Sequence, residues 1–393
     1  MFRILLMTVY LCVFLLTCYM QLEAGEDKEA DKLIEEAKKL AAKPSERELS
    51  TQSERTLNLN EFNPRLTVFG DFLGRIDNPD SFNHDGDNIS DRFSMKGVEL
   101  DLRADVDPFS KAVAIIGFHE HGPGEVHIHA EEAYLTLETL PCNLHMKMGK
   151  FLSGFGQINK THEHDLPWTT KPRVMEQFFS GHGLVTTGAN LSFLFPKQPL
   201  QLDIEVTNGE NHAILAGNDS RNLAYVGRLK YSIELGKSHF LEIGTSQLFG
   251  YNDADGKNYA AVTGFDFLYK WKPLRSGLYN SFVFQGEFLS ANIEKNTTAA
   301  SMQPSGAYAM LQYQIDKHWY AGVRYDWFEF VTDDTTSQQG GGVYISYYTT
   351  EFIRFRVGYE RHEDTLKNIE NTFYFQLTFV FGSHPAEPYW VNR

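Results

Sequence analysis

Residues 373–381 read Phe-Tyr-Phe-Gln-Leu-Thr-Phe-Val-Phe, and this stretch decides the fold class. Its large apolar side chains recur at every second position, while Gln376 and Thr378 fall on the other face. A period of two predicts a β-strand with one apolar and one more polar face. The same alternation runs through 353–359 and 321–327, where the polar face carries Arg354, Arg356 and Arg324.

Working outward, the period of two extends from Asn63 to Gly382 and predicts sixteen strands. We expect them at 64–74, 93–106, 110–119, 126–140, 144–156, 183–195, 200–208, 221–235, 239–251, 258–272, 280–292, 304–316, 318–329, 338–349, 352–363 and 370–382. The connections alternate between short turns and longer loops, which include 120–125, 157–182 and 330–337. This alternation is typical of an up-and-down membrane barrel.

Many of these segments end in aromatic residues, which suits the girdles of a membrane barrel at its two interfaces. They are Trp271, Tyr279, Trp319, Tyr320, Trp327, Tyr347 and Tyr348. We therefore predict an all-β, transmembrane, antiparallel up-and-down β-barrel of about 16 strands over residues 63–382. The alternative is a soluble protein of two or three β-sandwiches, whose turns need not alternate in length.

The N-terminus predicts export. Arg3 precedes the apolar stretch 4–16, and the small residue Ala24 offers a cleavage site, so we expect a signal peptide over residues 1–24. Residues 25–62 read as a periplasmic leader with one short helix at 27–42, ended by Pro44, and a linker. Residues 383–393 would form a C-terminal periplasmic tail.

Composition excludes several classes of protein. The 393 residues carry a net charge of −15, which leaves no positive excess for binding nucleic acid. Two of the three cysteines lie in the expected signal peptide, so only Cys142 remains and no disulfide can form within the mature chain. No catalytic signature such as G-x-S-x-G, H-E-x-x-H or a P-loop is present, and we expect no enzyme.

Several short stretches resemble the Gram-negative outer-membrane porins, and more narrowly the so-called zinc-regulated outer-membrane proteins. They are residues 68–74, 118–121, 131–134, 149–159 and 162–172, together with Trp390. The resemblance implies a passive pore in the outer membrane, surrounded by lipid and passing small ions or hydrophilic solutes, with a homotrimer as its assembly. Energised transport is not expected, because residues 25–62 are too few for a plug domain.

The longest connection, residues 157–182, is the third on its side of the barrel, and the porin resemblance implies that it folds inward as a constriction. Its candidate residues are His162, Glu163, His164, Asp165, Trp168, Lys171, Arg173 and Glu176. Arg324, Arg354 and Arg356, with Arg228 and Lys230, would form a basic wall opposite its acids. Rings of charged side chains tune ion selectivity. The alternative is an ordinary solvent-exposed loop.

Histidines cluster unevenly in the chain. His119, His121, His127 and His129 form a candidate site for zinc or copper, because neutral imidazoles beside a carboxylate bind such ions. Surface histidines without a metal are the alternative. The alternation set by Ala133 and Leu135 turns His127 and His129 outward, so a metal site there requires either a bulge or a strand end that lies above the membrane. A metal-binding or zinc-uptake protein is therefore the second functional hypothesis; otherwise no cofactor is expected.

Overall fold

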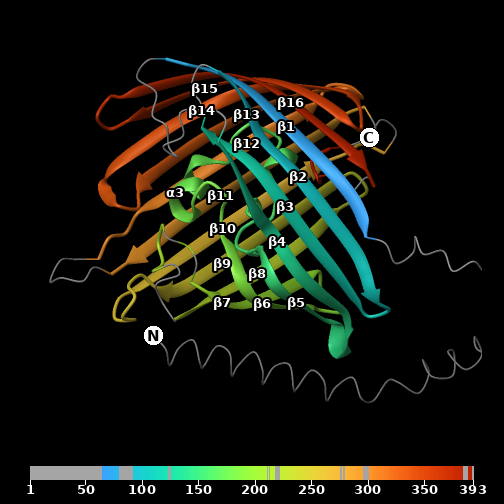
Figure 1. Cartoon of the computed structure of the whole chain (residues 1–393), viewed down its shortest axis with the longest axis vertical. Coiled ribbons are helices and arrows are strands. Elements are labelled where there is room, and N and C mark those ends of the chain that lie inside the picture. The colour runs from blue at the N-terminus through green and yellow to red at the C-terminus, as the bar shows by residue number, and fades with distance from the viewer. Residues whose placement is uncertain are drawn as a thin grey trace, which may run out of the picture. The chain divides into compact units, whose positions relative to one another are not determined.

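The computed structural model describes residues 64–78, 92–122, 125–209, 211, 213–216, 222–274, 277, 279–294, 301–383 and 388–391. Sixteen antiparallel strands form a closed barrel, in which each pairs with its sequence neighbours and β1 also pairs with β16 (Figure 1). This arrangement confirms the predicted fold class. The expected signal peptide, the leader and its helix lie outside the described residues.

The strands are β1 (Arg65–Asp77), β2 (Arg92–Asp107), β3 (Ser110–Gly122), β4 (Glu125–Leu140), β5 (Leu144–Leu152), β6 (Val185–Leu194), β7 (Leu200–Asn208), β8 (Leu223–Leu235), β9 (His239–Tyr251), β10 (Tyr259–Trp271), β11 (Ser281–Ile293), β12 (Ser305–Gln314), β13 (Trp319–Phe330), β14 (Asp333–Thr350), β15 (Ile353–Asp364) and β16 (Ile369–Gly382). The described part of the chain also contains short helices, which are η2 (Pro141–Asn143), η3 (Glu163–Asp165) and α3 (Arg173–Phe179). Among the residues described, no helix is both long and apolar enough to cross a bilayer.

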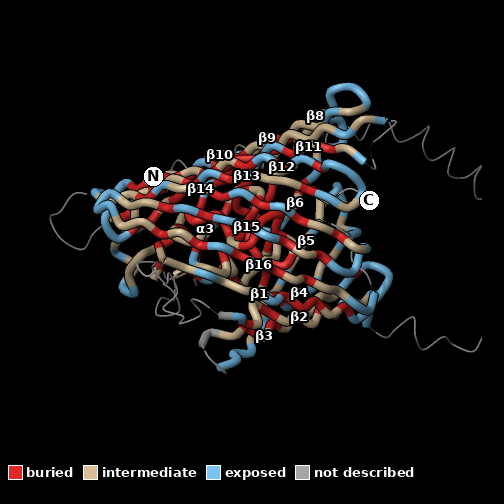
Figure 2. The backbone as a smooth tube through the Cα atoms, turned by 90° about the horizontal axis from the view of Figure 1, so that it is seen from above, coloured by how far each residue is buried: buried red, intermediate tan, exposed pale blue. Residues whose placement is uncertain are grey.

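The two faces of each strand have opposite character. On the outward face, Phe375 and Val323 are 43% and 50% exposed, whereas the inward neighbours Gln376 and Arg324 are 0% and 3% exposed. Figure 2 shows this alternation of buried and exposed residues along the strands. Apolar side chains are exposed on the outside and polar side chains are buried inside. This is the reverse of the arrangement in a soluble protein and is typical of a membrane barrel.

The structure contradicts the prediction of two outside loops, 330–337 and 120–125. Strand β14 begins at Asp333, which pairs with Phe330, so the connection expected at 330–337 shrinks to residues 331–332. Likewise β3 and β4 continue to Gly122 and Glu125, where a loop was expected. Polar residues can continue a ladder above the apolar belt, because backbone pairing does not require an apolar face.

The aromatic strand ends divide between the two faces. Trp319 and Tyr347 face outward with ring centroids 4.7 Å apart, as an interfacial girdle requires. The neighbouring Tyr320 and Tyr348 are buried inside the barrel, so their assignment to a girdle is wrong. Consecutive residues of a strand point to opposite faces. When two aromatic residues are adjacent in sequence, only one of them can therefore face the lipid.

Candidate functional site: the lumen loop

Residues 153–184, here called the lumen loop, connect β5 to β6 and fold into the barrel. Strands β5, β6 and β7 have only 9, 10 and 9 residues, so the barrel wall is short where the chain turns inward. Figure 1 shows the loop and α3 inside the ring of strands. Near its start the Gly154 N–H donates to Glu205 of β7, and further on Arg173 binds Glu370 of β16. The loop therefore crosses the lumen.

The first part of the loop is held through its backbone N–H groups. Gly154 donates to Glu205 Oε1 at 2.7 Å, and Ile158 donates to Glu287 Oε1 at 2.7 Å. Between them Gly156 has a φ of +63°, and a Cβ there would lie 2.1 Å from Glu287 Oε2. Only glycine tolerates both the left-handed backbone and so close an approach.

The middle of the loop is held through its carbonyl groups. Arg354 Nη2 donates to the carbonyl of His164 at 2.8 Å, and Arg356 Nη2 donates to that of Leu166 at 2.8 Å. Arg324 Nη1 donates to the carbonyl of residue 170 at 2.7 Å. We expected these arginines to face the loop's acids across open water. That expectation is wrong, because the guanidinium groups are buried and bind the loop backbone directly.

Arg173 at the start of α3 anchors the end of the crossing. Its guanidinium binds Glu370 through two nitrogens at 2.8 and 2.9 Å, and its backbone N–H donates to Asp326. Burial alone would lower the pKa of Arg173, but the Glu370 carboxylate outweighs burial and raises it. A bidentate, buried pair of this kind fixes both position and orientation.

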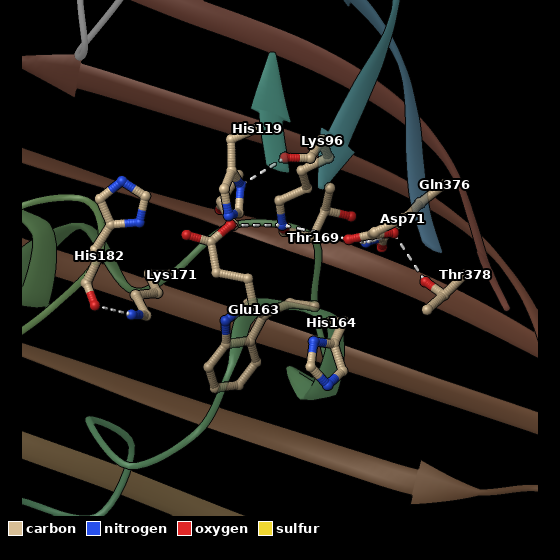
Figure 3. A network of polar contacts seen from close by, with 12 residues as sticks. Asp71, Lys96, His119, Glu163, His164, Thr169, Lys171, His182, Gln376 and Thr378 are labelled. Carbon is tan, nitrogen blue, oxygen red and sulfur yellow. Dashed lines mark hydrogen bonds and ion pairs between the residues drawn. The ribbon is translucent and has the colours of Figure 1, made fainter. Parts of the chain in front are cut away.

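Glu163 of the loop and Lys96 of β2 form an ion pair, with Nζ and Oε2 3.2 Å apart (Figure 3). Lys96 also donates to the carbonyl of Thr169 at 2.5 Å. Burial would raise the pKa of Glu163, but the nearby cations, Lys96 foremost, lower it to about 2. Lys171 donates to the carbonyl of His182 at 2.7 Å and so closes the far end of the loop.

The remaining predicted residues also lie in the lumen. His162 and His164 approach the Glu99 carboxylate of β2 at 3.4 and 3.1 Å. The ring of Trp168 is buried 5.2 Å from the Arg324 guanidinium, and Glu176 lies half-buried in α3. All eight expected residues belong to this inward-folded loop, and side-chain contacts with the strands are made by His162, Glu163, His164, Trp168 and Arg173.

Arg228 and Lys230 do not belong to a basic wall. Arg228 binds Asp266 at 2.7 Å, and Lys230 lies 3.3 Å from Glu242. Carboxylates of β7, β9, β10 and β11 outnumber these two cations, and they are Asp203, Glu205, Glu242, Asp266 and Glu287. The lumen therefore has an acidic side at β7–β11 and an arginine-rich side at β13–β15. The lumen loop joins the two.

Tyr389 and Trp390, near the C-terminus, belong to the site although the sequence did not predict it. Trp390 is buried against Tyr320 and Tyr348, and its Nε1 donates to the carbonyl of Asp165 at 2.6 Å. The described part of the expected tail thus lies inside the barrel against the lumen loop. Two adjacent aromatic residues in an otherwise polar tail were the feature of the sequence that could have indicated this burial.

The four histidines proposed as metal ligands separate in the structure. His119 and His129 face inward, with ring centroids 5.0 Å apart. His127 is exposed and pairs with Glu125, so it does not join them. His121 lies in β3, but its side chain is not among those described.

The chain has a sequence relative in Aquifex aeolicus. Over 340 residues it is 30% identical to an uncharacterized protein of that organism, covering 76% of this chain and 70% of that protein. The chain belongs to the family of this Aquifex protein. No protein-family model matches it. The Aquifex relationship therefore defines the family without supplying an activity.

Solved structures share the architecture of this chain at low sequence identity. Pseudomonas putida OprB has a TM-score of 0.57 at 9% identity, covering 83% of this chain and 96% of its own. The outer-membrane channel DcaP of Acinetobacter baumannii gives 0.53 at 12%, covering 81% and 96%. A loop-deletion mutant of OmpT, an outer-membrane protein of Vibrio cholerae, gives 0.52 at 10%, covering 81% and 100%. The fold is that of a Gram-negative outer-membrane β-barrel.

Proposed function

We propose that this protein is a porin of the Gram-negative outer membrane, through which small ions or hydrophilic solutes diffuse passively. The observation that carries the proposal is the lumen loop, which crosses a closed barrel between an acidic and an arginine-rich side. The channel described for DcaP, which shares the fold, supports it. No chemical step is required of any residue.

The mechanism is electrostatic sieving. Acids on β7–β11 and arginines on β13–β15 create a field across the lumen, and the loop narrows the water-filled space between them. Lys160 of the loop is exposed on the acidic side, where the Asp203 carboxylate attracts its ammonium group. Solutes would therefore pass the acidic side of the loop, because its other side is sealed against the arginines.

Single-channel conductance in a planar bilayer tests this function. Replacing residues 160–181 with a short Gly/Ser linker should enlarge the conductance and weaken ion selectivity, measured as the reversal potential under a salt gradient. Shortening the exposed connection 252–258 to the same kind of linker provides the control and should change neither quantity. A wild-type protein that inserts but conducts no current would contradict the proposal.

The arginine-rich side has its own test. Neutralising Arg354 and Arg356 to Gln should move the reversal potential toward cations, more strongly at low salt, because screening acts over about 10 Å at 0.1 M. The matched Arg→Lys variants retain the charge and should keep the wild-type sign of selectivity. Equal shifts in both pairs of variants would attribute the effect to loop displacement instead of charge.

The oligomeric state and the narrower family remain parts of the proposal. We propose a homotrimer embedded in lipid, for which the trimer form of Vibrio cholerae OmpT is a precedent of the same fold. Analytical ultracentrifugation in detergent tests it. The similarity to zinc-regulated outer-membrane proteins also stays a prediction.

A further inference from the structure

An imidazole–carboxylate cluster lies on the inner wall beside the lumen loop. It consists of His119 on β3 with His129 and Glu131 on β4, and one ligand atom of each lies within 4.8 Å of the others. His119 Nε2 and His129 Nε2 lie 2.7 and 2.9 Å from the same oxygen, Glu131 Oε1. Three potential ligands therefore converge on one point.

A β-bulge produces this convergence. In the pairing of β3 with β4, Ile115 opposes Glu132 while Ile116 opposes Ala130, so Glu131 has no partner in the ladder. The extra residue shifts the alternation by one, and Glu131 and Glu132 both face inward. Without the bulge, the register set by Ala133 would turn His129 outward. Bulges often re-aim side chains at functional sites in this way.

The ring of His119 is oriented as that of a metal ligand. Its Nδ1 lies 3.0 Å from the carbonyl of Lys96, which can only accept a hydrogen bond (Figure 3). In the neutral ring the proton is then on Nδ1, and the Nε2 lone pair points toward Glu131 Oε1. A lone pair facing a carboxylate oxygen needs a cation or a proton between them. Metal-binding histidines characteristically donate their other N–H to such a carbonyl.

Two further features support a metal site: Gly117 leaves space for the ligand atoms, and His182 is a potential fourth ligand. Gly117 lies opposite His129, and a Cβ there would come within 2.5 Å of Glu131 Oε1 and 2.6 Å of His119 Nε2. His182, at the end of the lumen loop, has its ring centroid 5.3 Å from that of His129. It is close enough to join the cluster by a side-chain rotation.

We propose that His119, His129 and Glu131, completed by His182, bind a divalent transition-metal ion such as Zn²⁺. Two or three imidazoles with one carboxylate in a four-coordinate arrangement suit Zn²⁺, whereas Mg²⁺ and Ca²⁺ prefer oxygen ligands. The bound ion would connect the wall at β3 and β4 to the lumen loop at His182. This site is independent of whether the barrel conducts.

Isothermal titration of the purified full-length protein in detergent with Zn²⁺ tests the site. We expect one tight site per chain that Mg²⁺ in large excess does not displace. Loss of a group that hydrogen-bonds to a metal ligand typically weakens metal binding about 10–100-fold. His129→Ala and Glu131→Gln each remove a ligand itself and should weaken Zn²⁺ binding at least as much. The control variants His127→Ala and His145→Ala remove exposed histidines and should bind like the wild type.

Gly117→Ala separates the site from general histidine binding, because it retains every ligand and fills only the space beneath them. It should weaken Zn²⁺ binding, while its unfolding midpoint shows whether the barrel is intact. If Glu131→Gln and His129→Ala bind as the wild type does, or if His127→Ala abolishes binding, the proposal is overturned. Conductance recorded in a metal chelator tests the porin function separately.

Discussion

At the scale of single residues, Gly156 is the most constrained position in the lumen loop. Its φ is +63°, and a Cβ added there would lie only 2.1 Å from Glu287 Oε2. Gly156→Ala should cost about 1–3 kcal/mol in backbone strain and displace Glu287 from the Ile158 N–H. The measurement is the thermal unfolding midpoint in detergent, together with conductance noise. Gly227→Ala, whose added methyl meets nothing within 4 Å, should leave both unchanged.

A second prediction at this scale concerns pH. Burial alone would lower the pKa of His162, but Glu99 and, more weakly, Glu132 and Asp165 raise it to about 9. An unfolded histidine titrates near 6.5, so protonated His162 stabilises the loop fully below about pH 6.5. That stabilisation, about 3 kcal/mol, is lost as the pH rises through 9.

Hydrogen exchange of residues 160–170, corrected for the intrinsic rate at each pH, measures this effect. Protection in the wild type should fall between pH 7 and pH 10. In His162→Gln it should be low and nearly constant over that range, and in the control His127→Gln it should follow the wild type. Identical profiles in wild type and His162→Gln would assign the pH dependence to another group.

At the scale of elements, the strands should respond to charge differently on their two faces. Val323→Arg places a charge on the lipid-facing side of β13 and should cost roughly 2–4 kcal/mol near mid-membrane. The sequence alone predicts that the inward neighbour Arg324 tolerates change. The structure predicts otherwise, because Arg324 binds Asp326 at 2.7 Å and the loop. The Lys230 side chain is 27% exposed and that of Arg324 is 0% exposed, so Lys230→Gln should cost less than Arg324→Gln. Urea unfolding in detergent compares the three variants.

The strands were predictable from sequence because a period of two is local, and observed boundaries such as those of β7 and β9 match the prediction. The inward course of residues 157–182 followed from length and from the resemblance to porins. The partners of Arg356 did not, since a contact between residues 190 apart depends on how the loop crosses the lumen. The sequence indicated the bulge at Glu131 only indirectly. The alternation set by Ala133 turns His129 outward, whereas a metal site requires it to face inward.

At the scale of the whole molecule, the chain end and the lumen loop depend on each other. Trp390 donates to the Asp165 carbonyl and packs against Tyr320 and Tyr348. Trp390→Ala should cost about 3–5 kcal/mol if the surroundings cannot collapse, and should increase hydrogen exchange of the loop around Asp165. Trp319→Ala, on the outward face, should not affect that exchange. Unchanged loop protection in Trp390→Ala would contradict the coupling.

The closure of the barrel also has a consequence for the order of assembly. Thr67 of β1 pairs with Gly382 of β16, so the seam joins the two extremes of the barrel sequence. Contacts between such distant residues form slowly, because a very long loop of chain must close first. The lumen loop lies within this ring and binds Glu370 on β16 itself. We therefore expect the loop to be in place when the seam closes, so that the last step of assembly joins the wall around its own constriction.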